Sequence, residues 1–211
     1  MESSKLVRDP QRELLSALLR AGRLLDQAGF CLATDGNFSA RLDSQTILLT
    51  RSGIEKRGLD ETSFVPVPLS DAKPPQGSSE WPLHRAIYRA RAEVMCILHV
   101  HSPFLTTYAA ARRVPPPMLL AESHMAIGEM AAVPFCPPGT PEVGESALKA
   151  GPQAMVYLLA NHGAVALGSS VDDALHRLER AEFLARVAWQ CEALGGGLPL
   201  TAQQLSEVPP C

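Results

Sequence analysis

The 211-residue sequence has few cysteines and few aromatic residues, and it has no long uninterrupted hydrophobic run. Its five cysteines are odd in number, scattered and without a Cys-x-x-Cys pair, which argues against a disulfide framework and a zinc ribbon. The longest apolar run, residues 94–100, contains a histidine and is too short to span a bilayer. No basic segment followed by an apolar one marks the start for export, so we expect a cytoplasmic protein.

An excess of positive charge is also missing. Nineteen basic residues stand against 22 acidic ones, and the formal net charge of −3 includes no basic stripe, so neither nucleic acid nor a membrane is an expected partner. Hydrophobic residues make up 46% and charged residues 19%, the balance of a globular protein. We predict one domain over residues 1–211, with a core at about 11–194 and a loosely held tail at 198–211.

Hydrophobic spacing predicts alternating helices and strands. Leucines recur at helical spacing after Gln11 up to a glycine, Gly29, where a helix would stop, and Ser79 with Pro82 marks the start of a second helix. Ser102-Pro103 marks another helix start, and further helices are expected at 142–150 and 170–195. Strands are expected at 38–42, 46–50, 94–100, 132–136, 155–160 and 164–168, and a Pro- and Gly-rich loop at 66–77. The pattern predicts an α/β domain whose largely antiparallel sheet packs between helices.

Three histidines at the ends of apolar elements predict a metal site. His99 and His101 are two residues apart at the end of a strand, so their side chains project to the same face while Val100 points into the core. His162 lies in a tight Asn-His-Gly loop between two strands. Three imidazoles with one open or carboxylate position are typical of catalytic zinc, and Glu80 at a helix start can complete the set and act as a base.

Each of these patterns alone is weak, because a His-x-His pair or a His-Gly turn is more often structural. Their combination favours the metal site. His84 and His176 lie within helices and are interpreted as surface or internally satisfied side chains, while the role of His124 stays open. None of the four lysines lies in an apolar strand where burial would depress its pKa, which disfavours Schiff-base chemistry.

Three small polar turns predict an anion-binding pocket. They are Gly36-Asn37-Phe38-Ser39, Thr50-Arg51-Ser52-Gly53 and Ser78-Ser79-Glu80. The last turn opens a helix, whose free N–H groups and dipole favour a phosphate. Helix capping or simple chain reversal explains each turn individually, so the prediction depends on all three meeting at one place.

Six stretches of the sequence, in this order, resemble the class II aldolase and adducin head family, and in particular its L-fuculose-1-phosphate aldolase branch. The stretches cover about residues 11–194 and are GNFSARL, ILLTRSG, SSEWPLHRAIY, ILHVHSP, PFCPPGT and NHGAVALG. The resemblance implies a three-layer α/β/α fold and a homotetramer with active sites at subunit interfaces. It also implies zinc, or manganese or cobalt, on His99, His101 and His162, with Glu80 as catalytic acid/base and metal ligand. The implied phosphate pocket consists of Asn37, Ser52, Gly53, Ser78 and Ser79.

The implied reaction is cleavage of a ketose 1-phosphate to dihydroxyacetone phosphate and an aldehyde through a zinc-stabilised enediolate. One departure is Phe135, at the position where fuculose-phosphate aldolases carry a catalytic tyrosine. A methylthioribulose-1-phosphate dehydratase, which shares the metal set and the phosphate site, remains an alternative, as does a sugar-acid phosphate decarboxylase that uses the same enolate. The 4-epimerase branch, which carries Asp in place of Glu80, is less favoured. A non-catalytic adducin-like structural head is the alternative of another class, against which the complete histidine and glutamate set counts.

Overall fold

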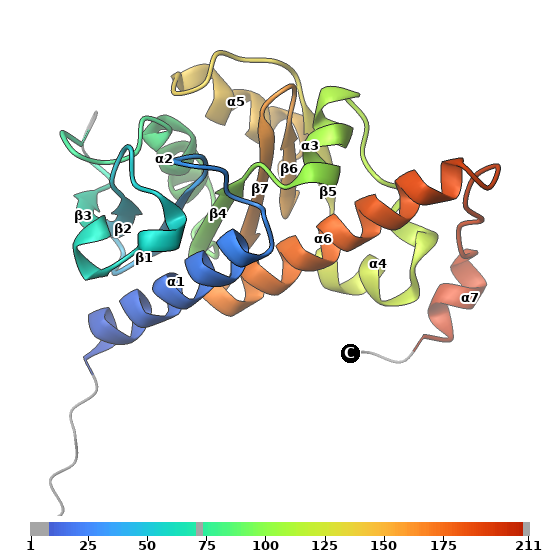
Figure 1. The fold of residues 1–211 in the computed structure, drawn as a ribbon, viewed down its shortest axis with the longest axis horizontal. Helices are drawn as coiled ribbons and strands as arrows, with labels where there is room; N and C mark the ends of the chain where they lie inside the picture. The colour runs from blue at the N-terminus through green and yellow to red at the C-terminus, as the bar shows by residue number, and fades with distance from the viewer. Residues whose placement is uncertain (1–8, 71–73, 209–211) are drawn as a thin grey trace, which may run out of the picture.

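The computed structural model of the chain describes residues 9–70 and 74–208, so residues 71–73 of the expected loop and 209–211 of the expected tail lie outside it. Seven strands form one sheet in the order β3-β2-β1-β4-β7-β6-β5 (Figure 1). All neighbouring strands are antiparallel except β5 and β6. The strands are β1 (Asn37–Arg41), β2 (Thr46–Thr50), β3 (Phe64–Pro68), β4 (Cys96–Val100), β5 (Met130–Val133), β6 (Val156–Leu159) and β7 (Gly163–Gly168).

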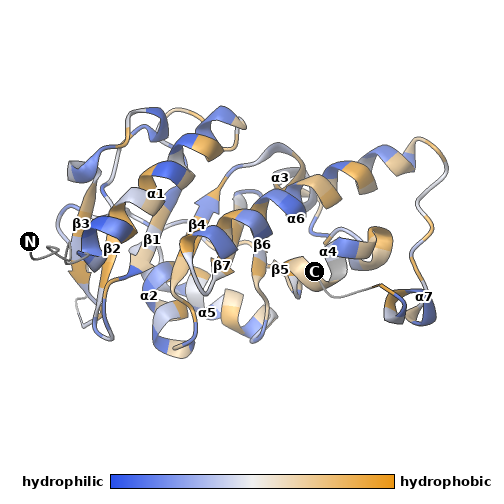
Figure 2. Ribbon diagram, turned by 90° about the horizontal axis from the view of Figure 1, so that it is seen from below, coloured by the Kyte–Doolittle hydropathy of each residue, from blue (hydrophilic) through white to orange (hydrophobic). Residues whose placement is uncertain are grey.

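Helices cover both faces of this sheet, which confirms the predicted three-layer α/β/α fold. One layer contains α1 (Pro10–Gln27), α3 (Pro103–Ala110), α4 (Ala121–Ile127) and α6 (Val171–Glu192), and the other contains α2 (Trp81–Ala90) and α5 (Pro141–Ala150) (Figure 1). Hydrophilic and hydrophobic bands follow one another along α1 and α6 (Figure 2), as expected for helices with one buried face. None of the helices in the described part of the chain is long and apolar enough to cross a membrane.

Alternation along β4 divides its side chains between the two helical layers. Leu98 and Val100 belong to the core that includes α1 and α6, whereas Ile97 belongs to the core that includes α2 and α5. The predicted inward direction of Val100 is therefore confirmed. His99, two residues after Ile97, projects into the layer of α2, where Glu80 begins that helix.

Some elements differ from the expectation. The loop expected from Pro66 begins only after β3, which contains Pro66 and Pro68 and pairs with β2 at the edge of the sheet. An edge strand accepts proline because one side of its backbone needs no ladder hydrogen bond. The strand expected at 132–136 begins earlier, at Met130, and the helices α4 and α7 (Ala202–Ser206) were not predicted.

The segment that follows His101 is fixed by a carboxylate from another helix. Glu182 of α6 is buried and accepts hydrogen bonds from the Ser102 hydroxyl and from the backbone N–H groups of Phe104 and Leu105, all at 2.8 Å. These two N–H groups lie in the first turn of α3 and have no partner within that helix. Glu182 therefore caps α3 from outside and fastens the end of the His-x-His segment to α6.

We expect Glu182→Ala to lower the free energy of unfolding by about 3 kcal/mol, because three donors at the start of α3 would lose their acceptor. The matched control is Glu179→Ala, one turn away on the exposed side of α6, which should leave stability within about 0.5 kcal/mol of the parent. Urea denaturation followed by circular dichroism measures both values. Equal stability of the two variants would show that the cap contributes little.

Candidate active site

His99 and His101 meet at the end of β4. His99 is 1% exposed within the strand, whereas His101 follows the last strand residue, and its backbone N–H donates to the Phe30 carbonyl at 3.0 Å. Their Nε2 atoms are 3.2 Å apart, and their ring centroids are 5.1 Å apart. The two-residue spacing therefore directs both rings to one point, as the sequence predicts.

His162 reaches the same point from the turn between β6 and β7. Its ring centroid is 4.8 Å from that of His99 and 4.9 Å from that of His101. The left-handed residue of this turn is Asn161, with φ of 58°, not Gly163. Gly163 is needed for another reason, because a Cβ there would lie 2.5 Å from the Val100 carbonyl oxygen and 2.6 Å from the His101 ring.

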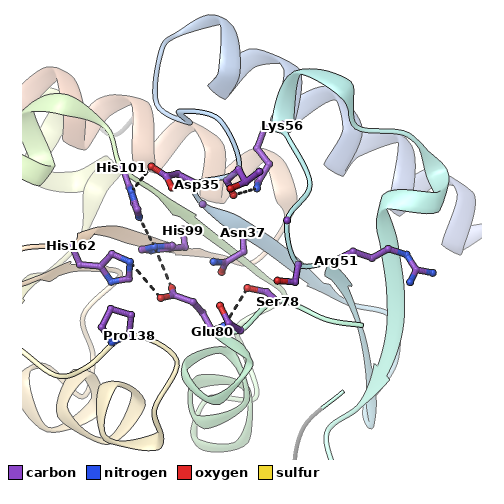
Figure 3. Close-up of a pocket in the computed structure, with 15 residues that line it drawn as sticks. Asp35, Asn37, Arg51, Lys56, Ser78, Glu80, His99, His101, Pro138 and His162 are labelled. Carbon is purple, nitrogen blue, oxygen red and sulfur yellow. Dashed lines mark hydrogen bonds and ion pairs between the residues drawn. The ribbon is translucent and has the colours of Figure 1, made fainter. Parts of the chain in front are cut away.

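Glu80 completes the cluster from the N-terminus of α2. The Ser78 hydroxyl accepts a hydrogen bond from the Glu80 backbone N–H at 3.2 Å, and the Ser78 N–H donates to the Thr50 carbonyl at 2.9 Å. The Glu80 carboxylate oxygens lie 3.3 Å from Nε2 of His99 and 3.4 Å from Nε2 of His162 (Figure 3). Burial raises the pKa of Glu80, while hydrogen bonding to Asn37 and the charge of His101 lower it.

The chemistry of this donor set fits a divalent cation. A tetrahedral zinc with ligand distances of about 2.0–2.1 Å separates neighbouring ligand atoms by about 3.3 Å. The observed separations of 3.2, 3.3 and 3.4 Å match that spacing, and one nitrogen from each of the three histidines lies within 4.8 Å of the others. The buried Oε2 atom of Glu80 receives no hydrogen bond from the described residues, so a cation would supply its missing partner.

The histidines are held in the form that binds metals. Burial lowers the pKa of His99, His101 and His162, and their mutual repulsion adds to this effect at His99 and His101. Neutral imidazole is the ligating form. Nδ1 of His101 lies 3.2 Å from a carboxylate oxygen of Asp35, so that carboxylate orients the ring from behind, in the usual arrangement of metal-binding histidines.

The three polar turns meet beside this cluster, in a cavity of about 350 Å³ (Figure 3). Each turn is fixed to its neighbours: the Ser52 N–H donates to the Gln76 carbonyl, and the Phe38 N–H donates to the Thr50 hydroxyl. The cavity is lined by every residue predicted for the site, namely Asn37, Ser52, Gly53, Ser78, Ser79, Glu80, His99, His101 and His162.

Lys56 also lines this cavity, and its burial was not predicted from the sequence. It lies in a short 3-10 helix and is 1% exposed, and its ammonium donates to the carbonyls of Thr34 at 2.9 Å and Ile54 at 2.8 Å. It therefore joins the segment before Asn37 to the segment after Gly53. Burial lowers the pKa of Lys56, partly offset by Cys31 and Asp35. Of the other lysines, Lys149 is exposed, and Lys5 and Lys73 lie outside the described residues.

The histidines outside the cluster, and Phe135, do not line the cavity as far as the structure describes them. His84 is fully buried with two polar partners, as a satisfied side chain would be, and His176 is exposed on α6. The side chain of His124 lies outside the described part of the structure. Phe135 is 57% exposed and does not line the cavity of its own chain.

Comparison with known proteins assigns this fold to one family. Residues 16–189 match the model of the class II aldolase and adducin N-terminal domain, which is most of the chain. The chain belongs to this family, and the resemblance seen in the sequence is confirmed. It is an enzyme of the class II aldolase type.

The relatives within this family catalyse different reactions. A 3-oxo-tetronate 4-phosphate decarboxylase of Haemophilus influenzae is 30% identical over 84% of this chain and 86% of its own length. A methylthioribulose-1-phosphate dehydratase of Serratia proteamaculans is 31% identical over 86% of this chain and 95% of its own. The L-fuculose-1-phosphate aldolase of Thermus thermophilus shares the fold, with a TM-score of 0.79 and 24% identity over 90% of this chain and all of that one.

We expect the isolated protein to bind one divalent ion per chain, and His101→Ala to abolish this binding. Asp35→Ala should weaken it by roughly 10–100-fold, because the ring of His101 would lose its orienting carboxylate. Exposed His176 provides the control, since His176→Ala should bind like the parent. Titration with Co²⁺, followed by its visible absorption, measures all four proteins. Unchanged binding by His101→Ala would place the ion elsewhere.

Proposed function

We propose that this protein is a metal-dependent lyase that cleaves a carbon–carbon bond in a small phosphorylated keto sugar. The observation that carries the proposal is the meeting of the histidine and glutamate cluster with the three polar turns in one cavity. The cluster suits the carbonyl end of such a substrate, and the turns suit its phosphate. A ketose 1-phosphate of the fuculose-1-phosphate kind, cleaved to dihydroxyacetone phosphate and an aldehyde, is our first candidate.

The phosphate would lie among backbone and side-chain donors of the polar turns. Ser52, Gly53 and Ser79 line the cavity beside Asn37, and Lys56 adds a cation. Charge-assisted hydrogen bonds from such donors to phosphate oxygens are stronger than neutral ones. Lys56 would also hold the two turns at a fixed separation, since its ammonium binds a carbonyl on each side.

Glu80 is the proposed acid and base. Its carboxylate lies against His99 and His162, and burial raises its pKa, which moves the group toward the range where it exchanges protons at neutral pH. A bound divalent cation would supply a Lewis acid, which stabilises the negative charge that develops on the carbonyl oxygen of the substrate when the bond breaks. We propose zinc as this ion, with manganese or cobalt as substitutes, because imidazole and carboxylate suit all three.

A dehydratase is the second candidate, and the lack of a side-chain hydroxyl on Phe135 favours it. Phenylalanine has no hydroxyl with which to exchange a proton with an aldehyde, whether in the cavity of its own chain or in that of a partner subunit. Loss of water needs a base that takes a proton from the carbon next to the carbonyl and an acid that gives a proton to the leaving hydroxyl, and Glu80 would carry out both transfers in turn. Decarboxylation needs no acid on the departing fragment. The 31% identical dehydratase and the 30% identical decarboxylase support both alternatives.

We further propose a cytoplasmic homotetramer with active sites at its subunit interfaces. Phe183 and Trp189 on α6 are 58% and 54% exposed, and large exposed apolar side chains of this kind are typical of subunit contacts. The four cysteines in the described part of the chain are free thiols, which suits a reducing compartment.

The reaction is tested with metal-loaded enzyme and a panel of ketose 1-phosphates and 3-oxo sugar-acid phosphates. Dihydroxyacetone phosphate released together with an aldehyde reports aldol cleavage, carbon dioxide reports decarboxylation, and a product 18 mass units lighter reports dehydration. Aldol cleavage or decarboxylation supports the carbon–carbon lyase, and dehydration alone replaces it with the second candidate. No turnover of any phosphorylated keto sugar would overturn the proposed substrate class.

We expect Glu80→Gln to lower turnover of the active substrate by roughly 10²–10⁴-fold while KM changes much less, because the amide cannot accept the proton. Three histidines remain to hold the metal, so metal content should persist. Steady-state kinetics on protein of measured metal content separates the two effects. Near-parental turnover with metal bound would leave Glu80 as a ligand only.

We expect Lys56→Met to raise KM for the phosphorylated substrate roughly tenfold, since a charge-assisted contact near the anion is lost. Lys149→Met removes an exposed lysine and serves as the control. Inhibition by inorganic phosphate should weaken in parallel for Lys56→Met alone. An unchanged KM together with unchanged phosphate inhibition would remove Lys56 from the binding site.

A further inference from the structure

A row of buried polar side chains runs from the cavity into the layer between β1 and α2. Nε2 of His84 lies 2.5 Å from Oδ1 of Asn37, Nδ1 of His84 lies 2.6 Å from the Ser39 hydroxyl, and that hydroxyl lies 3.0 Å from the Tyr88 hydroxyl. Asn37 is 6% exposed, and the other three are at most 2% exposed. Among these four residues only Asn37 lines the cavity.

The secondary structure accounts for this row. Asn37 and Ser39 are two residues apart on β1 and project to the same face of the sheet, while His84 and Tyr88 are one turn apart on α2. Neighbouring positions on the buried side of α2, Leu83 and Ile87, are apolar. Buried polar groups cost stability unless every donor finds an acceptor, so the row must be internally matched.

The matching fixes which atom donates. Burial lowers the pKa of His84 to about 3, so its ring is neutral at physiological pH and has one N–H donor and one acceptor. At the cavity end, the carboxylate of Glu80 accepts from Asn37, which requires the NH₂ group of Asn37 to face Glu80. Its carbonyl oxygen then faces His84, whose Nε2 must carry the hydrogen. Nδ1 accepts from Ser39, and the Ser39 oxygen accepts from Tyr88.

We propose that His84 is a positioning residue that holds the Asn37 amide with its NH₂ group toward the cavity, where it serves Glu80 and an oxygen of the anionic substrate. A free amide would turn over and present its carbonyl oxygen to an anion. His84 does not line the cavity, and it would act on the site through its contact with Asn37. The substrate part of this role rests on the proposed function.

The tautomer of His84 is the most direct test. Long-range ¹H–¹⁵N NMR spectra of the full-length protein distinguish the two neutral forms, and we expect Nε2 protonated and Nδ1 bare. Ser39→Ala removes only one oxygen and should release the ring to populate both forms. Predominantly Nδ1-protonated His84 in the parent protein would overturn the proposal, whatever reaction the enzyme catalyses.

A binding experiment tests the consequence at the cavity. His84→Phe keeps a planar ring without its donor, whereas His84→Gln restores a donor toward Asn37 and an acceptor toward Ser39. We expect His84→Phe to weaken inorganic phosphate binding and raise KM roughly tenfold with unchanged metal content, and His84→Gln to recover most of the loss. Arg89→Ala, exposed at the end of α2, is the control.

The outcomes separate this proposal from the proposed function. If the parent protein does not bind phosphate, the proposed substrate class fails, while the tautomer still decides the orientation of Asn37. If the parent binds phosphate and folded His84→Phe binds it equally well, or His84→Gln is no better than His84→Phe, the row only packs the core and the proposal is overturned. Should His84→Phe not fold, Ser39→Ala is expected to weaken phosphate binding about threefold, and no change would overturn the proposal.

Discussion

The pairing register of the three central strands, β1, β4 and β7, determines which face of the sheet carries the site residues Asn37 and His99. In this register Asn37 of β1 is opposite His99 of β4, and His99 is opposite Val165 of β7. A shift of one residue would turn His99 into the layer of α1 and α6, away from Glu80, because side chains alternate along a strand. Buried apolar side chains on both faces hold the register, since the same shift would move the whole apolar pattern of β4 to the other side. The hydrophobic core therefore positions the polar site.

Much of this arrangement can be predicted from the sequence because it depends on short-range geometry. The two-residue spacing of His99 and His101 fixes their common face, and the leucine spacing of α1 fixes its buried side. Residues that act through long-range contacts were less predictable. The buried Lys56 ammonium binds two carbonyls that lie 22 and 2 residues away in sequence, and no local sequence pattern indicates such a pair. The edge position of β3 likewise depends on the complete sheet, and its prolines suggested a loop.

Two parts of the site differ in how they are supported. Glu80 and Ser78 are fixed by a helix start that is hydrogen-bonded to the end of β2, and His99 is fixed within a strand. His101 and His162 lie just beyond strand ends and are less deeply buried, with side chains 21% and 19% exposed. The rigid half lies toward the core and the accessible half toward solvent, an arrangement that lets substrate approach while the proposed base keeps its position.

Gly163, the residue after His162, affects how the sequences of other family members are interpreted. A side chain at Gly163 would collide with the backbone of β4 at Val100, whether or not any ion or substrate ever binds nearby. Selection for a foldable sheet is thus sufficient to retain this glycine, even in a descendant that had lost all catalysis. Gly163 is therefore required by the packing of β7 against β4, whereas His162 is the residue of this turn that we propose as a metal ligand.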